Sequence, residues 1–423
     1  MGVLKPHGRY SRGHGSFVVS DLPQLDLSLL AGRRVLVRAD LNVPLDGDVI
    51  TDITRIDRFL PTVDALRRAG AIVIIITHLG RPGGKTNPTL STLPIANALR
   101  EKLGSAVLHA KDCVGQRVEK LVGDLANGDV LVLENVRFHQ GETENSAAFA
   151  LRLSVLGDYY VNDAFSCAHR AHASTHAITN YLPSFAGPSL IAEIEALEKA
   201  LEKPAKPVAA LVGGAKISTK IPVLLNLIPR IDYLIIGGGM ANTFLAAKGR
   251  SMGKSLYEEE AIDAALDVMV LAQELDCKLV LPEDLVVAKE FKSNASNRTV
   301  DTKNIGDDEM ALDLGSISQH KIVSVLEKCK TLLWNGPLGA FEIEPFDGAT
   351  SAVARAAAYL TKQGELVTIA GGGDTVAALN NAGVTADFTY VSTAGGAFLE
   401  WLEGKKLPGI AALYSTEQMK QEA

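Results

Sequence analysis

The sequence predicts an α/β protein with two Rossmann-like parallel-sheet domains joined by a hinge helix. Short apolar runs of strand length alternate with longer helix-like segments along most of the 423 residues, and this alternation is typical of parallel sheets with crossover helices. The ten apolar runs are more than one sheet usually holds. Residues 182–188, rich in proline and glycine, lie near the middle of the chain and mark the expected joint between two lobes.

The expected strands fall on both sides of this joint. They are residues 35–37, 72–76, 130–133, 159–161, 208–212, 233–236, 279–281, 331–334, 366–369 and 388–391. Helices are expected between most of them, for example over residues 53–69 and 258–275, and the hinge helix is expected over residues 189–202, before Lys203-Pro204.

These signals predict five segments. They are a disordered extension (1–20), an N-terminal domain (21–186), a hinge (187–204), a C-terminal domain (205–403) and a tail (404–423) that packs back on the N-terminal domain.

Charge and composition exclude several classes of protein. The net charge is −7, so we expect no nucleic-acid partner. No apolar run reaches the ~18 residues of a membrane span, and the first 16 residues lack the apolar core of a secretory signal. The four cysteines form no Cys-x-x-Cys pair, which disfavours zinc and disulfides and favours a cytoplasmic protein.

Arginine, histidine and acidic or amide residues follow the expected strands of the first half. The arginines are Arg38, Arg81, Arg137 and Arg170, and Arg55 opens the helix after the first strand. Ligands of open parallel sheets bind beyond the carboxyl ends of the strands, and guanidinium groups pair with carboxylate or phosphate. A single arginine more often makes a structural ion pair, but five together predict a small, highly anionic substrate.

Three histidines, His78, His169 and His172, add possible donors at the same sheet edge. A lone histidine at a strand end is more often structural. His169 and His172 lack a third protein ligand at metal spacing, so we do not expect a metal there.

Glycine runs follow the strands of the second half. In Gly213-Gly214-Ala215-Lys216-Ile217-Ser218-Thr219-Lys220, the chain passes from a strand to a helix. We expect that helix to begin near Ile217 or Ser218, with Lys216 at its mouth and Lys220 one turn further on. Free N–H groups and two ammonium groups predict a phosphate site. A tight turn with two solvated lysines is an equally favoured alternative.

A second glycine run, Gly371-Gly372-Gly373, leads to Asp374-Thr375 and an expected helix over residues 376–380. Phosphate at that helix start and an Asp374 carboxylate holding Mg²⁺ would fit; Asp374 as a helix N-cap is the alternative. Residues 80–86 and 249–255 resemble P-loops but are each one residue short. The sequence has no G-x-G-x-x-G, which disfavours a dinucleotide site.

These motifs, in this order, resemble those of the phosphoglycerate kinase family from about residue 29 to about residue 409. The matching motifs are Arg38-Ala39-Asp40-Leu41-Asn42-Val43-Pro44, His78-Leu79-Gly80-Arg81-Pro82, Leu133-Glu134-Asn135-Val136-Arg137-Phe138, Asn162-Asp163-Ala164-Phe165, Gly213-Gly214-Ala215-Lys216, Trp334-Asn335-Gly336-Pro337 with Phe341-Glu342, and Gly371-Gly372-Gly373-Asp374. The resemblance implies a monomeric, bilobal, Mg²⁺-dependent kinase of glycolysis that transfers a phosphoryl group between 1,3-bisphosphoglycerate and ADP, giving 3-phosphoglycerate and ATP.

The resemblance also implies residue roles. Arg55 and Lys216 match the catalytic residues, and Asp374 matches the metal-linked aspartate. The phosphoglycerate pocket is matched by Arg38, Asp40, Asn42, His78, Arg81, Arg137 and Arg170. The nucleotide site is matched by Gly214, Lys220, Gly238, Asn335, Pro337, Glu342, Gly371, Gly372, Gly373, Asp374 and Thr375.

One turn departs from the family pattern: Ser-Thr-Gly-Gly-Gly reads Ser392-Thr393-Ala394-Gly395-Gly396 here. Because Arg55 and Lys216 lie in different halves, we expect hinge closure to bring them together. Two rival hypotheses are an NAD-dependent dehydrogenase, which would carry the missing glycine fingerprint, and a non-catalytic scaffold, which would show damage at Arg55, Lys216 or Asp374.

Overall fold

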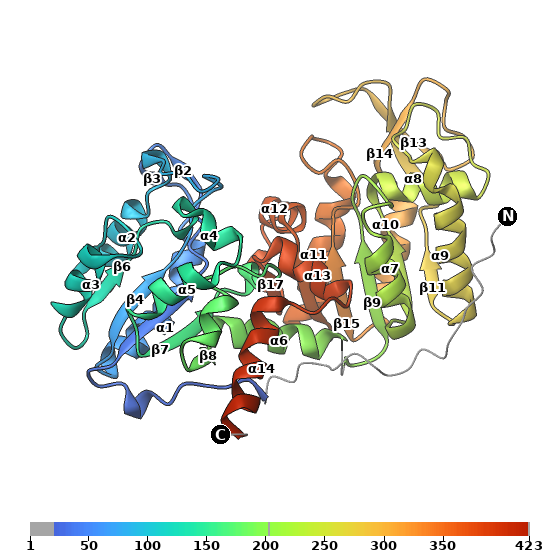
Figure 1. Cartoon of the computed structure of the whole chain (residues 1–423). Helices are drawn as coiled ribbons and strands as arrows, with labels where there is room; N and C mark the ends of the chain where they lie inside the picture. The colour runs from blue at the N-terminus through green and yellow to red at the C-terminus, as the bar shows by residue number, and fades with distance from the viewer. Residues whose placement is uncertain (1–20, 202–203, 422–423) are drawn as a thin grey trace.

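Two six-stranded parallel sheets, one in each half of the chain, form the framework of the protein (Figure 1). The structure is a computed structural model that describes residues 21–201 and 204–421. The expected disorder of residues 1–20 and the expected end of the hinge helix at residues 202–203 lie outside the described residues. None of the described helices is long and apolar enough to cross a membrane.

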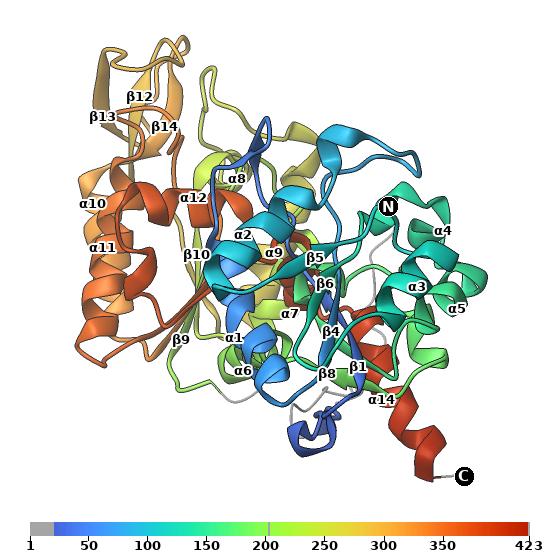
Figure 2. The same cartoon turned by 90° about the vertical axis from the view of Figure 1, so that its left-hand side faces the viewer.

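The N-terminal sheet has the order β5-β6-β4-β1-β7-β8, and all its neighbouring strands are parallel. Its strands are β1 (Arg34–Ala39), β4 (Ile72–Ile76), β5 (Val107–His109), β6 (Val130–Val132), β7 (Tyr159–Asp163) and β8 (Ser184–Ala186). Its helices are α1 (Thr54–Arg68), α2 (Leu93–Leu103), α3 (Gln116–Gly123), α4 (Gln140–Thr143) and α5 (Ala147–Ser154). Figure 2 shows α1 and α2 on one side of this sheet and α3 and α5 on the other.

The C-terminal sheet has the order β11-β10-β9-β15-β16-β17 and is also parallel throughout. Its strands are β9 (Val208–Val212), β10 (Tyr233–Ile236), β11 (Lys278–Val280), β15 (Thr331–Asn335), β16 (Val367–Gly371) and β17 (Tyr390–Ser392). Its helices are α7 (Ile221–Leu227), α8 (Gly238–Ala247), α9 (Ile262–Glu274), α10 (Ser316–Leu326), α11 (Gly348–Lys362), α12 (Gly373–Asn381) and α13 (Gly395–Leu402).

Side chains along each strand point alternately to the two faces of the sheet and so contribute to two hydrophobic cores. In β9, for example, Ala210 packs with one apolar cluster while Ala209 and Leu211 pack with the cluster on the opposite face. β4 (IVIII) is buried along its whole length, as expected for a strand covered by helices on both faces. The long apolar runs of the sequence therefore become the central strands.

Two helices connect the halves: α6 (Pro188–Leu201) and α14 (Pro408–Gln421). Both run beneath the gap between the lobes in Figure 1. Leu190 of α6 and Ile410 of α14 share one core cluster with Phe165 of the N-terminal half and Phe398 of the C-terminal half. α14 also contacts β8, so this helix lies against the N-terminal sheet.

Together, the two sheets contain all ten expected strands, with ends that differ from the expected ones by at most two residues. Several other elements were not predicted. β5 and β8 are three-residue strands near the edges of the N-terminal sheet, and β8 lies within the expected interdomain joint. An antiparallel sheet, β13-β12-β14, is also new; its strands are β12 (Asp284–Ala288), β13 (Asn297–Asp301) and β14 (Met310–Leu314). A short hairpin is formed by β2 (Leu45–Asp46) and β3 (Val49–Ile50).

These elements escaped prediction because they are short or carry polar residues without an apolar run. The helix expected over residues 258–275 is also divided. Its first turn is a 3-10 helix (Glu259–Ala261), and α9 follows.

Candidate active site

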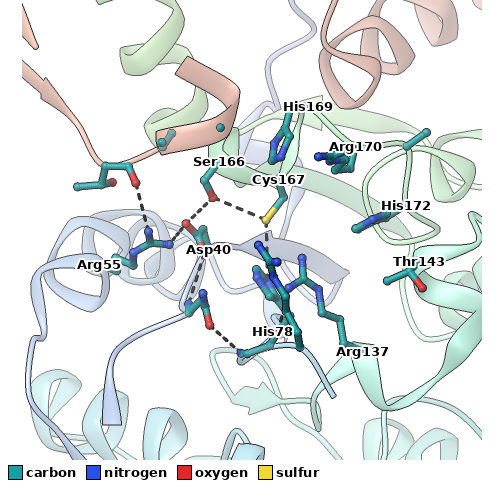
Figure 3. A pocket seen from close by; sticks show the side chains of 18 of the residues that line it. Asp40, Arg55, His78, Arg137, Thr143, Ser166, Cys167, His169, Arg170 and His172 are labelled. Carbon is teal, nitrogen blue, oxygen red and sulfur yellow. Dashed lines mark hydrogen bonds and ion pairs between the residues drawn. The ribbon is translucent and has the colours of Figure 1, made fainter. Parts of the chain in front are cut away.

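The carboxyl end of the N-terminal sheet opens into a cavity of about 950 Å³. Four arginines and one aspartate supply its charged lining: Arg55, Arg81, Arg137, Arg170 and Asp40. The remaining polar lining includes His78, His169 and His172, and residues Thr393 to Gly396 close the cavity from the C-terminal half. We call this space the arginine cavity (Figure 3). Its excess of positive charge suits a small anion.

Asp40 organises the floor of the arginine cavity. It follows β1 directly, and its carboxylate accepts hydrogen bonds from Arg55 of α1 and from Ser166. Ser166 lies in the 3-10 helix η5 (Phe165–Cys167), which follows β7. Because β1 and β7 are adjacent and parallel, the loops after them meet at one sheet edge, and Asp40 holds Arg55 there.

Arg38 lies beneath the cavity instead of lining it. Its side chain is 0% exposed, and it donates to Ser174 Oγ at 2.9 Å and to His78 Nδ1 at 3.0 Å. The expected contact of Arg38 with substrate is therefore wrong for this conformation, because a side chain of β1 that points into the packed layer cannot reach the cavity. Arg38 instead positions His78.

A loop after β4 is held by two of the predicted residues. Asn42 Oδ1 accepts from the N–H of Gly80 at 2.8 Å, and Arg137 donates to the carbonyl of Gly80 at 2.9 Å. Gly80 has φ +60°, a left-handed conformation that favours glycine. Arg137 Nε is buried without a hydrogen-bond partner among the described residues, so a donor is left for a ligand. Arg81 and Arg170 are exposed at the mouth.

The histidines of the cavity are held neutral. Burial, followed by the charge of Arg38, holds the pKa of His78 well below its usual range. Burial and the nearby Arg137 lower the pKa of His172 to about 4. The Nδ1 atoms of His169 and His172 are buried without hydrogen-bond partners in the described part of the chain. These rings supply neutral polar groups, while the arginines supply the charge.

The corresponding edge of the C-terminal sheet carries a second cavity of about 350 Å³, which we call the glycine cavity. Its polar lining includes Lys216, Lys220, Asn335, Asp374 and Thr375. A Cβ added to Gly213 would collide with the carbonyl oxygen of Pro337, so only glycine lets these two loops approach each other. The backbone is thereby exposed to a ligand.

The turn that carries the two lysines differs from its prediction. α7 begins at Ile221, and Lys220 is its N-cap residue; Lys216 lies on the preceding turn. Pro222 cannot donate the N–H that would make the first turn continuous with α7. The expected start of the helix near Ile217 or Ser218 is therefore wrong, and Lys220 does not lie one turn inside the helix, although both lysines line the glycine cavity. Lys220 donates to Asn335 Oδ1.

Gly371 and Gly372 of the second glycine run lie in different elements. Gly372, with φ +103°, is the N-cap of α12, so Asp374 lies in the first turn and is not the cap. Gly371 lies inside β16 and accepts a hydrogen bond from Asn335 Nδ2 at 2.7 Å, and a Cβ there would collide with Phe398. Gly371 supports Asn335 and does not line the cavity.

A third cavity, of about 660 Å³, adjoins the glycine cavity, with which it shares Gly214, Pro337 and Asp374. Gly238 and Glu342, which the sequence predicts on the nucleotide side, also line it. Apolar walls come from Leu256, Phe291, Met310 and Leu312. A cavity lined by glycine backbone and apolar side chains suits an aromatic base, and we call it the apolar slot.

The fit of a magnesium nucleotide rests on Asp374. This carboxylate lies in the first turn of α12 beside Lys220, whose charge it influences. Mg²⁺ typically takes one or two protein carboxylates and completes its shell with phosphate oxygens and water. The residues present fit that pattern.

The two halves already touch across the cleft. Arg55 Nη2 donates to the carbonyl of Thr393 at 3.2 Å, and Arg58 donates to the carbonyl of Val391 at 3.2 Å. Arg55 lines the arginine cavity and Lys216 lines the glycine cavity. The two predicted catalytic residues therefore face different cavities in this structure.

A family model for phosphoglycerate kinase matches residues 25–405. The chain belongs to the phosphoglycerate kinase family. The phosphoglycerate kinase of Rhizorhabdus wittichii is 56% identical over 388 residues, which cover 92% of this chain and 98% of the relative. The phosphoglycerate kinase of Zymomonas mobilis is 55% identical over the same coverage.

Solved structures of other phosphoglycerate kinases agree. The Coxiella burnetii enzyme superposes with a TM-score of 0.85 at 42% identity, covering 93% of this chain and 99% of that one. The Pyrococcus horikoshii enzyme gives a TM-score of 0.78 at 29% identity, covering 92% of this chain and 98% of that one. The bilobal parallel-sheet fold is thus confirmed.

Sequence reasoning missed part of this phosphoglycerate kinase site. Ser166, Cys167 and the walls of the apolar slot were not assigned, because small polar and apolar side chains carry no motif of their own. The strand-end rule could have found Ser166, which follows β7. Leu256 and Phe291 come from segments outside the central strands and had no such signal.

Asp313, on the wall of the apolar slot, predicts a pH effect on stability. Burial raises its pKa to about 7; Oδ2 accepts from Ala349 N–H at 2.8 Å, and Oδ1 has no partner among the described residues. The folded protein keeps this proton while the unfolded chain releases it near pH 3.8. The contribution of protonated Asp313 to the free energy of unfolding is therefore complete below pH 3.8 and is lost as the pH rises through about 7.

As the pH rises from 4.5 to 6.5, the contribution of Asp313 to the free energy of unfolding should fall by ~1.4 kcal/mol per pH unit. Asp313→Asn should remove this slope in urea unfolding, whereas Asp263→Asn, on an exposed part of α9, should keep it. Equal slopes in native protein and Asp313→Asn would contradict the assignment.

Proposed function

We propose that the arginine and glycine cavities hold the two substrates of the phosphoglycerate kinase reaction. That reaction is the reversible transfer of a phosphoryl group from 1,3-bisphosphoglycerate to ADP, giving 3-phosphoglycerate and ATP, with a carboxyl group as acceptor in reverse. One observation carries the assignment: the carboxyl edges of the two sheets carry complementary cavities, one rich in arginine and one rich in glycine and lysine.

The phosphoglycerate anion is assigned to the arginine cavity. Arg81 and Arg170 at the mouth would attract it, and Arg137 would use its unpartnered Nε as a donor. Asp40 suits a hydroxyl group, because a carboxylate accepts from O–H and repels the anionic ends of the substrate. Asn42 and Arg38 would act indirectly, by holding the Gly80 loop and His78.

The nucleotide is assigned to the glycine cavity and the apolar slot. The base would lie against Gly214 and Gly238, and Glu342 would reach the ribose. Lys220 and the start of α12 would hold the phosphates. When Mg²⁺ is bound, it neutralises phosphate charge, and Asp374 is the residue that would hold it.

Phosphoryl transfer would need the lobes to close. Charge spreads over the equatorial oxygens of a loose transition state, so positioned cations supply most of the stabilisation. Arg55 and Lys216 would flank the moving group from opposite lobes. No general base is required, because the acceptor oxygen is already anionic. Closure would also exclude water, which hydrolyses acyl phosphates. We propose α6 as the hinge that absorbs the motion.

We also propose a monomer that acts in the cytoplasm and does not bind nucleic acid. All four cysteines are unpaired in the structure, which suits a reducing compartment. Size-exclusion chromatography with light scattering tests the monomer: a mass of about 45 kDa is expected from the 44.9 kDa chain, and about twice that value would contradict it.

A coupled assay with 3-phosphoglycerate, ATP and Mg²⁺ tests the function directly. Turnover that needs all three components is expected. Folded protein without turnover would overturn the proposal. Neither rival hypothesis is supported: the dehydrogenase lacks its fingerprint, and Arg55, Lys216 and Asp374 are all intact.

Lys220→Ala should act on nucleotide binding. Losing a charge-assisted contact to phosphate costs about 1.5–3 kcal/mol, so we expect KM for ATP to rise ~10- to 100-fold while KM for 3-phosphoglycerate changes less than twofold. Steady-state kinetics with each substrate varied would measure this. Lys248→Ala, at an exposed end of α8, is the matched control. An equal rise in both KM values would contradict the assignment.

A further inference from the structure

A cysteine forms part of the wall of the arginine cavity. Cys167 ends the 3-10 helix η5 and is 5% exposed. Its Sγ lies 3.6 Å from Arg38 Nη2, 3.9 Å from His78 Nδ1 and 3.7 Å from Ser166 Oγ. Figure 3 shows the sulfur between Ser166 and His78. The phosphoryl transfer described above makes no use of this thiol.

Polar and positively charged side chains surround the sulfur of Cys167. The nearest cation, Arg38, is completely buried and points an N–H group at the sulfur. Arg55 and Arg137 also interact electrostatically with Cys167. A thiolate is the reactive form of cysteine, and the N–H group of Arg38 is placed to donate a hydrogen bond to this sulfur.

The same cavity also holds buried polar atoms that lack hydrogen-bond partners. Arg137 Nε and His172 Nδ1 are buried without hydrogen-bond partners among the described residues, and His172 Nδ1 lies 3.9 Å from Glu142 Oε1. Both are polar atoms that gain a hydrogen bond when a ligand arrives. The cavity is large enough, at about 950 Å³, for small polar molecules to reach Sγ.

The other three cysteines provide a contrast within the same chain. Burial raises the pKa of Cys277 and of Cys329 to about 11 and raises the pKa of Cys113 well above its usual value. Each lies in an apolar cluster. Buried thiols of this kind are inert.

A metal site is the alternative use of this cluster. Ligand atoms of Asp40, His78 and Cys167 lie within 4.8 Å of one another. However, Arg55 already pairs with Asp40, and Arg38 contacts both His78 and Cys167. A dication would have to approach two guanidinium groups, so the cluster does not suit a metal.

We propose that Cys167 is a peroxide-sensitive thiol whose oxidation closes the arginine cavity to its substrate. The thiolate attacks hydrogen peroxide: an S–O bond forms, the O–O bond breaks, and the second oxygen leaves as hydroxide, which takes up a proton to give water. Sulfur is oxidised to sulfenic acid by two electrons, and the peroxide is reduced. The added oxygen would occupy the space beside Arg38 and His78. This consequence rests on the proposed function of the cavity.

The test uses the full-length native protein, treated with hydrogen peroxide and then with dimedone, which traps sulfenic acid. Peptide mass mapping should show Cys167 labelled at least tenfold faster than Cys113, Cys277 or Cys329, with activity lost in parallel. Saturating 3-phosphoglycerate should slow both events at least tenfold, whereas ATP alone should not. Dithiothreitol added before dimedone should restore activity, because sulfenic acid is reducible.

Two variants separate the effect from general damage. Cys167→Ser should retain its own starting activity under peroxide, whereas Cys277→Ser should be inactivated like the native protein; each is compared with itself before treatment. Uniform labelling of the four cysteines, or unchanged inactivation of Cys167→Ser, would overturn the proposal. If Cys167→Ser does not fold, the peptide map of native protein decides alone. Activity before treatment tests the proposed function separately.

Discussion

Lys216→Ala is expected to lower kcat by ~10²- to 10³-fold, the usual effect of removing one preorganised donor from a transition state. Lys216 is exposed at the glycine cavity, on the turn that Glu258 holds by accepting from Ser218 N–H at 2.9 Å. The turn keeps its shape without the ammonium group, so the loss should fall on kcat. The coupled assay at saturating ATP and 3-phosphoglycerate would measure it.

The same substitution should leave the fold intact, because exposed substitutions usually change the free energy of unfolding by less than about 0.5 kcal/mol. Lys248→Ala is a matched exposed control and should turn over within twofold of native protein. Near-normal kcat in Lys216→Ala would remove Lys216 from the catalytic step.

Arg55→Ala is the second large effect, and a fall in kcat of ~10²- to 10³-fold is expected. Arg55 reaches from α1 to Asp40 in its own half and to the Thr393 carbonyl in the other half. Losing its guanidinium removes a cation from the lobe interface at the place where the phosphoryl group would pass. Single-turnover kinetics would separate this chemical step from product release.

Two further variants sharpen the result. Arg68 lies in the last turn of α1 and its side chain is 81% exposed. The Arg68→Ala variant should therefore have the kcat of native protein. Arg55→Lys keeps the charge but loses the planar fork, so it should recover only part of the rate. Equal activity of Arg55→Ala and Arg68→Ala would contradict the role of Arg55.

The central strands could be predicted from the sequence, because complete burial requires continuous apolar runs such as Ile72–Ile76. Most residues of the candidate site could also be located, because they directly follow strands of a parallel sheet. Parallel strands bring their carboxyl ends to one edge. The edge strands and the small sheet β13-β12-β14 could not be predicted in this way. Their stability comes from pairing with strands distant in the sequence, which leaves no local pattern.

The directions of individual side chains could not be predicted from the sequence either. Arg38 and Asp40 are two residues apart in the sequence, yet Arg38 is buried and Asp40 lines the arginine cavity. Lys216 was expected at the mouth of a helix and Lys220 one turn further on, but the helix begins only at Ile221, next to Pro222. Such details depend on a single hydrogen bond or a single steric clash, which spacing alone does not encode.

The sequence by itself determined the fold class, the division into an arginine-rich and a glycine-rich half, and the family. Tertiary structure alone decided which side chains share a cavity, that Cys167 lies against Arg38, and that Arg55 already bridges to Thr393 while Lys216 faces a separate cavity. The physical reason is range. Periodicity and turn chemistry act within a few residues, whereas the electrostatics of this site arise between residues more than a hundred positions apart, such as Arg38 and Cys167.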